Sequence, residues 1–120
     1  MNSDAGDKPY NLEQRTFQFA KESRTFVKRL PRTITNFEDV KQLVRASGSI
    51  GANYIEANEC IGKKDFVMKI KTCRREAKES AYWLRLLDCS NDLEQPRREL
   101  ASEALELMKI FGSIVRKSDT

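Results

Sequence analysis

Four segments of the chain carry apolar or small residues at alternating steps of three and four positions. The clearest of these repeats consists of Phe37, Val40, Val44, Ser47, Gly51, Tyr54 and Asn58. Other repeats run from Phe66 to Leu87, from Leu12 to Leu30 and from Leu100 to Ile114. Alternation of this kind puts one stripe of side chains on the same side of an α-helix. The chain is therefore predicted to be all-α, because no strand pattern competes.

Short polar connections separate the four predicted helices. Residues that cap or end helices are predicted at Asn11, Pro31, Asn36, Gly62 and Pro96. Helices of about 20–25 residues joined by short connections pack as antiparallel neighbours. We therefore predict a single domain, an antiparallel up-down four-helix bundle over residues 11–116. Residues 1–10 are expected to form a flexible N-terminal tail, and residues 117–120 are expected to fray.

The residue types present exclude most nucleophilic and zinc chemistry. The 120 residues include no histidine, which removes Ser-His and Cys-His pairs and the common zinc motifs. The three cysteines, Cys60, Cys73 and Cys89, form no Cys-x-x-Cys pair. Cys73 falls on a predicted seam, which indicates a small core residue. We expect no catalytic site and no enzyme activity.

Two pairs of glutamates are the remaining candidates for metal ligands. Glu56 and Glu59 lie three residues apart, as do Glu76 and Glu79. Bundle proteins that bind two iron ions use Glu-x-x-His motifs, and both pairs lack the histidine. The ion pairs expected instead are Glu76 with Arg45 or with an arginine of a neighbour, and Arg75 with Glu79. No metal or other cofactor is therefore predicted.

The chain also lacks targeting and membrane signals. It contains no stretch of about 18 apolar residues, as a membrane span requires. The first seven residues are polar and carry no apolar segment of a secretory signal. The cytoplasm is therefore the expected location.

Apolar or small residues lie outside the predicted seams on three of the helices. They include Ala46, Ser49, Ala52, Met68, Trp83, Leu105 and Met108. Scattered exposed apolar residues are normal on a monomer, but contiguous patches indicate an interface. We expect these residues to mediate self-association into a symmetric homo-oligomer.

Basic residues recur on the outer side of the third predicted helix. Lys64, Lys71, Lys78 and Arg85 are spaced seven residues apart, and Arg75 and Tyr82 lie beside them. A stripe of cations with an aromatic ring is typical of surfaces that bind nucleic acid. Lys21, Arg24 and Lys28 of the first helix are expected to add to this stripe. The alternative is a solvated helix face that neighbouring acidic groups neutralise.

Two runs in the second and third predicted helices resemble a known family. They are LVRASGSIGANYIEANE at residues 43–59 and REAKESAYWL at residues 75–84, the latter preceded by Lys64-Asp65-Phe66. Together they are similar to the four helix bundle proteins encoded by intervening sequences of 23S rRNA genes, formerly labelled as ribosomal protein. Related proteins include the accessory variability determinants of diversity-generating retroelements, which are basic pentamers that work with a reverse transcriptase and nucleic acid.

The resemblance implies a homopentamer associated with ribosomal RNA, and it supplies no catalytic residues. It also implies that Asn53, Glu56, Asn58 and Glu76, which match the family's motif, serve contacts between subunits or helices. The leading hypothesis is a non-enzymatic homo-oligomer that binds 23S rRNA or another structured RNA. The alternative is a protein–protein scaffold with no nucleic-acid role.

Overall fold

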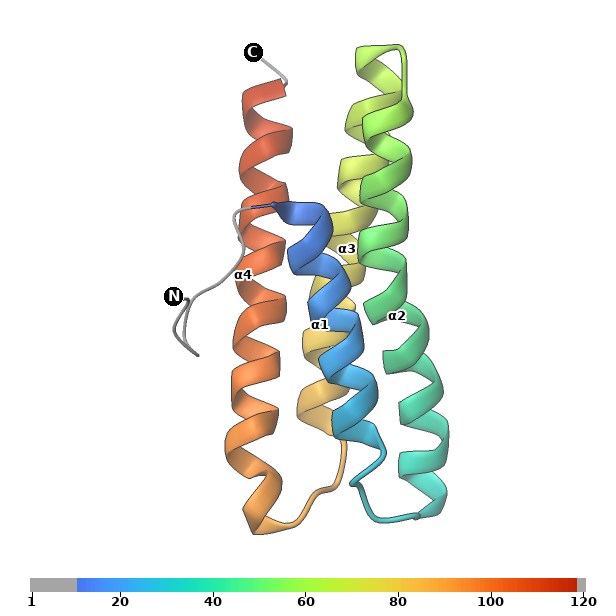
Figure 1. Ribbon diagram of the computed structural model, residues 1–120, viewed down its shortest axis with the longest axis vertical. Coiled ribbons are helices and arrows are strands. Elements are labelled where there is room, and N and C mark those ends of the chain that lie inside the picture. Colours follow the sequence, from blue (N-terminus) through green and yellow to red (C-terminus); the bar gives the residue numbers. More distant parts are fainter. Residues whose placement is uncertain (1–10, 119–120) are drawn as a thin grey trace.

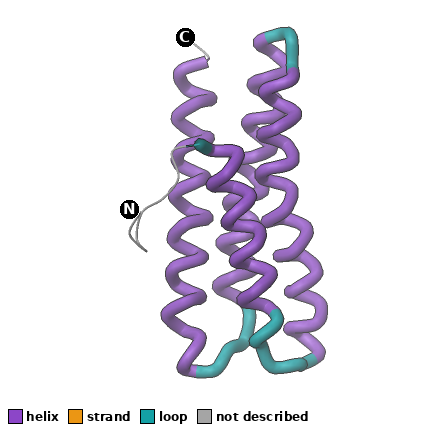
Figure 2. Tube along the Cα trace, in the orientation of Figure 1, coloured by secondary structure: helices purple, strands orange, loops and turns teal. Residues whose placement is uncertain are grey.

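The computed structural model describes residues 11–118, which form four α-helices joined by short connections (Figures 1 and 2). Helix α1 spans Leu12–Val27, α2 Ile34–Glu59, α3 Lys63–Leu86 and α4 Glu94–Ser118. A single 3-10 turn at Asn91–Leu93 precedes α4. No strand occurs in this part of the chain, so the all-α prediction is confirmed. The predicted tail lies outside the described residues, as do positions 119 and 120.

Successive helices run in opposite directions along the long axis of the molecule (Figure 1). Helix α1 packs against α2 and α4, and α3 packs against the same two helices. Within residues 11–118, no Cα atom of α1 comes within 8 Å of one in α3, so these helices are diagonal partners. Helix α1 has 16 residues against 24–26 for the others, and the α2–α3 turn projects beyond it (Figure 1).

The structure confirms the predicted N-cap residue of α1 and contradicts that of α2. The side chain of Asn11 accepts hydrogen bonds from the backbone N–H groups of Glu13 and Gln14 at 2.8 and 3.2 Å, as a cap should. Helix α2, by contrast, is capped by Thr33, whose hydroxyl accepts from the N–H of Asn36 at 3.1 Å. The prediction of Asn36 as a cap is wrong, because the helix begins earlier and carries this side chain into the interior.

Asn36 instead joins the two connections at one end of the bundle. Its amide donates to the carbonyl oxygens of Pro31 at 3.0 Å and Asp88 at 2.9 Å. Its own amide oxygen accepts from the N–H of Asp88 at 2.9 Å. The α1–α2 and α3–α4 connections are thereby held together by one buried side chain.

Glycine does not end α2 in the predicted manner. Cys60 is the C-cap residue, and Gly62 is the N-cap of α3 with φ of −94°. This extended conformation is open to any residue, so the predicted left-handed cap at Gly62 is wrong.

The core follows the predicted seams in α1, α3 and α4. Its fully buried members include Phe19, Ile70, Leu84, Leu107 and Phe111. Cys73 is also fully buried, which confirms its interpretation as a core residue.

The predicted seam of α2 is wrong by one residue. The buried residues are Leu43, Ile50 and Ala57, whereas Phe37 is 65% exposed. Helix α2 is small or apolar on two sides, so both registers fit its pattern. Burying Leu43 and Ile50 removes more apolar area from water than burying Val44 and Gly51, which favours the observed register.

Candidate nucleic-acid interface

The outer side of α3 presents the predicted stripe to solvent. Its six residues, all exposed, are Lys64, Lys71, Arg75, Lys78, Tyr82 and Arg85. Seven residues make nearly two helical turns, so positions at this spacing lie above one another about 10.5 Å apart along the axis. From Lys64 to Arg85 the stripe is about 31 Å long.

Helix α4 adds cations that the sequence analysis missed. A β-carbon built on Gly112 would lie 3.6 Å from Cδ of Arg74 and 3.5 Å from Nη1 of Arg116, so these arginines meet over this glycine. Lys109 is three residues before Gly112 on the same flank of α4, and Arg98 continues this flank toward its start. The sequence did carry a signal for these cations. Arg98, Lys109 and Arg116 recur at helical spacing on α4, and no acidic residue interrupts their stripe.

The two stripes form one surface, which we call the α3–α4 basic face. Its nine cations are Lys64, Lys71, Arg74, Arg75, Lys78, Arg85, Arg98, Lys109 and Arg116, all exposed. Within residues 11–118, the one ion pair that any of them makes is Arg75 with Glu76 at 3.7 Å. The face is therefore almost free of neutralising partners among the described residues.

Interhelical ion pairs hold most carboxylates of α3 and α4 away from this face. Glu76 and Glu79 reach toward α2, where Arg45 approaches them at 3.4 and 3.3 Å. The predicted pair of Glu76 with Arg45 is confirmed, whereas Glu79 pairs with Arg45 in place of Arg75.

Helix α4 turns two carboxylates toward α1 in the same way. Nε of Arg15 lies 2.7 Å from Glu103, and its Nη2 lies 2.9 Å from Glu106. The hydrogen bonds from Arg15 to Glu103 raise the pKa of the arginine. Ion pairs thus follow the α2–α3 and α1–α4 seams and leave the α3–α4 seam positive.

The first-helix cations do not join the basic face of the same chain. Lys21 is exposed on α1 and Lys28 at its C-cap, and α1 is diagonal to α3. The guanidinium of Arg24 instead bonds the carbonyl oxygens of Ala20 at 3.2 Å and Val44 at 3.4 Å. The prediction that these three residues extend the stripe is therefore wrong within one subunit.

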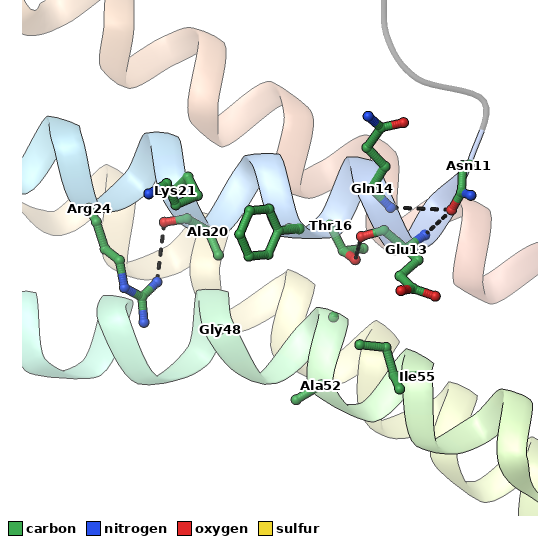
Figure 3. Close-up of a pocket in the computed structure, with 12 residues that line it drawn as sticks. Asn11, Glu13, Gln14, Thr16, Ala20, Lys21, Arg24, Gly48, Ala52 and Ile55 are labelled. Atoms are coloured by element: carbon green, nitrogen blue, oxygen red, sulfur yellow. Dashed lines mark hydrogen bonds between the residues drawn. The ribbon is translucent and has the colours of Figure 1, made fainter.

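A groove runs between α1 and α2, on the side of the bundle away from α3 and α4 (Figure 3). It encloses about 700 Å³, and Phe17, Ala20, Ala52 and Ile55 supply apolar walls. Phe17 is 64% exposed and was not singled out in the sequence. The signal was a large aromatic side chain one position beyond the seam residue Thr16.

The predicted subunit-contact residues lie on three sides of the bundle. Ala52 lines the α1–α2 groove, and Leu105 and Met108 lie on the flank of α4 toward α3. The α2–α3 side carries Ser49, Asn53, Glu56, Met68 and Trp83. These residues therefore do not form one continuous surface.

Several of these residues make contacts within the chain instead. The Asn53 amide donates to the backbone and hydroxyl oxygens of Ser49, both at 2.9 Å. Glu56 accepts from Nζ of Lys69 at 2.7 Å, and this bond raises the pKa of the lysine. Ala46 is fully buried in the bundle and Glu76 is 5% exposed, so neither can contribute substantially to a contact between subunits.

The described residues offer little for metal or thiol chemistry. Residues 11–118 contain no group of three or more side chains of the metal-binding types placed to hold an ion. Burial raises the pKa of Cys73 to about 12, which keeps this thiol protonated. Over the same residues, none of the helices combines the length and apolar character that crossing a bilayer requires.

Comparison with known proteins agrees with this architecture. A similar solved structure is that of a protein of unknown function from the S23 ribosomal protein family of Bacteroides thetaiotaomicron. The match has a TM-score of 0.77 and 28% identity, and it covers 88% of this chain and 98% of that one. No curated protein matches significantly. Residues 9–113, most of the chain, match the model of one family, and the protein therefore belongs to the 23S rRNA-intervening sequence protein family.

Proposed function

We propose that this protein is a non-enzymatic, cytoplasmic homo-oligomer that binds structured RNA through the α3–α4 basic face. The observation that carries the proposal is the segregation of charge. Nine exposed cations share this face, while the nearby carboxylates Glu76, Glu79, Glu103 and Glu106 lie on other flanks. The family's association with 23S rRNA intervening sequences supports RNA as the polyanion.

Unpaired cations on a rigid helix are suited to phosphate binding. Each phosphate that a lysine or arginine neutralises releases condensed counterions, which drives association at moderate salt. A cation that is already paired with a carboxylate would have to exchange one anion for another, so it would contribute less binding free energy. The number of exposed cations on the basic face and the scarcity of such partners therefore favour it as the RNA-binding surface.

The test is fluorescence anisotropy with a hairpin of 23S rRNA and a matched DNA duplex, across a salt series. We expect affinity for the RNA that falls steeply with salt. The triple variant Lys71→Glu, Lys78→Glu, Arg85→Glu should abolish binding at moderate salt. Where binding persists at low salt, the slope of log K against log salt should become less negative by roughly 2–3, because three phosphate contacts are lost.

A charge-matched control separates the face from net charge. Lys28→Glu, Arg29→Glu and Arg32→Glu change the net charge equally but lie in the connection between α1 and α2, outside the basic face. This variant should retain most of the affinity. Equal losses in both variants, or unchanged binding by the α3 variant, would contradict the proposal.

Self-association is supported by apolar side chains on the α1–α2 side. Phe17, Phe37 and Ile55 are each more than two-fifths exposed there, and a second copy of the chain would bury them. A pentamer, which we propose, would have a mass of about 70 kDa from chains of 13.9 kDa. Analytical ultracentrifugation of the protein and of Phe17→Ser tests this assembly, and a monomer at all concentrations would contradict it.

A protein–protein scaffold is the second candidate, and the α1–α2 groove favours it. Its apolar walls at Phe17 and Ile55 suit a polypeptide better than a polyanion. The same titration distinguishes the two functions. Absence of RNA binding even at low salt, with an intact assembly, would favour the scaffold.

A further inference from the structure

An exposed aromatic ring lies near the C-terminal end of α3, between cations of the α3–α4 basic face. The side chain of Tyr82 is 56% exposed, and among residues 11–118 no hydrogen bond or cation–π contact engages it. Its one aromatic contact among the described residues is with Trp83, whose ring centroid lies 5.0 Å away with the two planes at 80°. Trp83 is itself partly buried against the core, so this contact orients the tyrosine ring on a fixed support.

Cations flank the ring along the helix axis. Lys78 precedes Tyr82 by four residues and Arg85 follows it by three, which places them about 6 Å and 4.5 Å away along the axis. Both are exposed and neither is paired with a carboxylate within the described residues. A phosphate backbone that follows these cations would pass directly over the tyrosine.

Phosphate contacts alone do not distinguish paired from unpaired nucleotides, whereas an aromatic ring does. The faces of bases inside an A-form duplex are covered by their stacked neighbours. Unpaired bases in loops, bulges and single strands are free to stack on protein side chains. An exposed ring between cations therefore selects for unpaired nucleotides.

We propose that Tyr82 stacks on an unpaired base, so that the preferred ligand is RNA with single-stranded nucleotides rather than an uninterrupted duplex. This inference rests on the proposed function, because it assigns a ligand class to the same face. It also assigns a role to Trp83 as the support that orients the ring.

The experiment uses two labelled RNAs with the same stem, one closed by an unpaired loop and one blunt-ended. Tyr82→Leu removes the aromatic face but keeps apolar bulk, and Tyr82→Phe is the matched control that keeps the ring. We expect Tyr82→Leu to weaken binding of the hairpin by about 5- to 100-fold. Its affinity for the blunt duplex and its salt slope should not change, since no phosphate contact is lost. Tyr82→Phe should bind both RNAs like the unchanged protein.

Trp83, the single tryptophan of the chain, provides a second readout. A base that stacks on Tyr82 changes the surroundings of the adjacent indole, so the hairpin should alter tryptophan fluorescence more than the duplex does. In Tyr82→Leu this difference should disappear.

The possible failures are distinguishable. Equal, salt-dependent binding of both RNAs by the unchanged protein and by Tyr82→Leu would overturn the inference and leave the proposed function standing. Absence of binding to either RNA at low salt would overturn both. A smaller assembly in Tyr82→Leu, measured by sedimentation, would show that the tyrosine is a subunit contact and would overturn the inference.

Discussion

Substitution of Gly51 by alanine should destabilise the protein, although alanine favours helix formation. A β-carbon at Gly51 would lie 2.8 Å from Oγ1 and 3.3 Å from Cβ of Thr16 in α1. Thr16 is fully buried, and its hydroxyl donates to the carbonyl oxygen of Leu12 at 2.7 Å. This β-branched side chain has little freedom to move aside, so α1 and α2 must separate.

The magnitude follows from two opposing terms. Inside a helix, alanine stabilises the folded state by about 1 kcal/mol relative to glycine. Overpacking a rigid site costs about 1–3 kcal/mol. We therefore expect Gly51→Ala to lower the free energy of unfolding by about 1 kcal/mol.

Gly112 provides the matched control, because it lies within α4 and a β-carbon there makes only ordinary contacts at 3.5 and 3.6 Å. Gly112→Ala should raise the free energy of unfolding by about 1 kcal/mol. The melting temperatures of the two variants should therefore differ by roughly 8 °C in a domain of this size.

The assay is urea and thermal unfolding followed by circular dichroism at one fixed protein concentration, because assembly contributes to apparent stability. Adding Thr16→Ala to Gly51→Ala should relieve the clash, so this pair should show a favourable coupling of about 1 kcal/mol. Equal stability of Gly51→Ala and Gly112→Ala, or absence of coupling to Thr16, would refute the steric argument.

Two further predictions concern buried polar groups. Asn36→Ala should lower the free energy of unfolding by about 3 kcal/mol, because it leaves backbone groups of Pro31 and Asp88 without partners. Asn36→Asp should cost more at neutral pH, since a carboxylate would face two carbonyl oxygens; urea denaturation that ranks the aspartate variant as the more stable would contradict this. The thiol of Cys73 stays protonated to about pH 12 when folded but ionises near pH 9.0 when unfolded, so its contribution to stability is present below pH 9 and lost as the pH rises toward 12. The stability of Cys73→Ala should therefore fall less between pH 8.5 and 10.5 than that of the unchanged protein, by up to about 1.4 kcal/mol per pH unit.

The number, order and direction of the helices were predictable because hydrophobic periodicity repeats over many turns. The rotation of α2 was not, since two of its sides are small or apolar and the pattern alone does not say which is buried. The choice depends on how Leu43 and Ile50 fit between α1, α3 and α4, which is a property of the packed bundle. The role of Asn36 was missed for a related reason, because its partners lie in connections that meet only in the folded chain.

The candidate site was predictable only within one helix. The heptad spacing of Lys64, Lys71, Lys78 and Arg85 determines that they share a side of α3, whatever packs elsewhere. Which other cations join them depends on helix adjacency, and the sequence suggested α1 where the bundle places α4. Contact between Arg74 and the Gly112 position shows this adjacency directly.

Charge segregation also explains how a chain with a net charge of only +4 presents a strongly basic surface. Arg15 and Arg45 hold carboxylates at seams that the basic face does not include. These acidic residues lower the net charge but lower the potential over α3 and α4 less than carboxylates on the face itself would. In the proposed ring, each subunit would contact one neighbour through the α1–α2 groove and the other through a second surface. The basic face stays free where this second surface is the α2–α3 side. Several faces on one assembly would then bind one RNA with a higher effective concentration than separate chains. The local charge of the surface that would bind phosphates therefore depends on the helix flank on which each carboxylate lies, rather than on the overall composition.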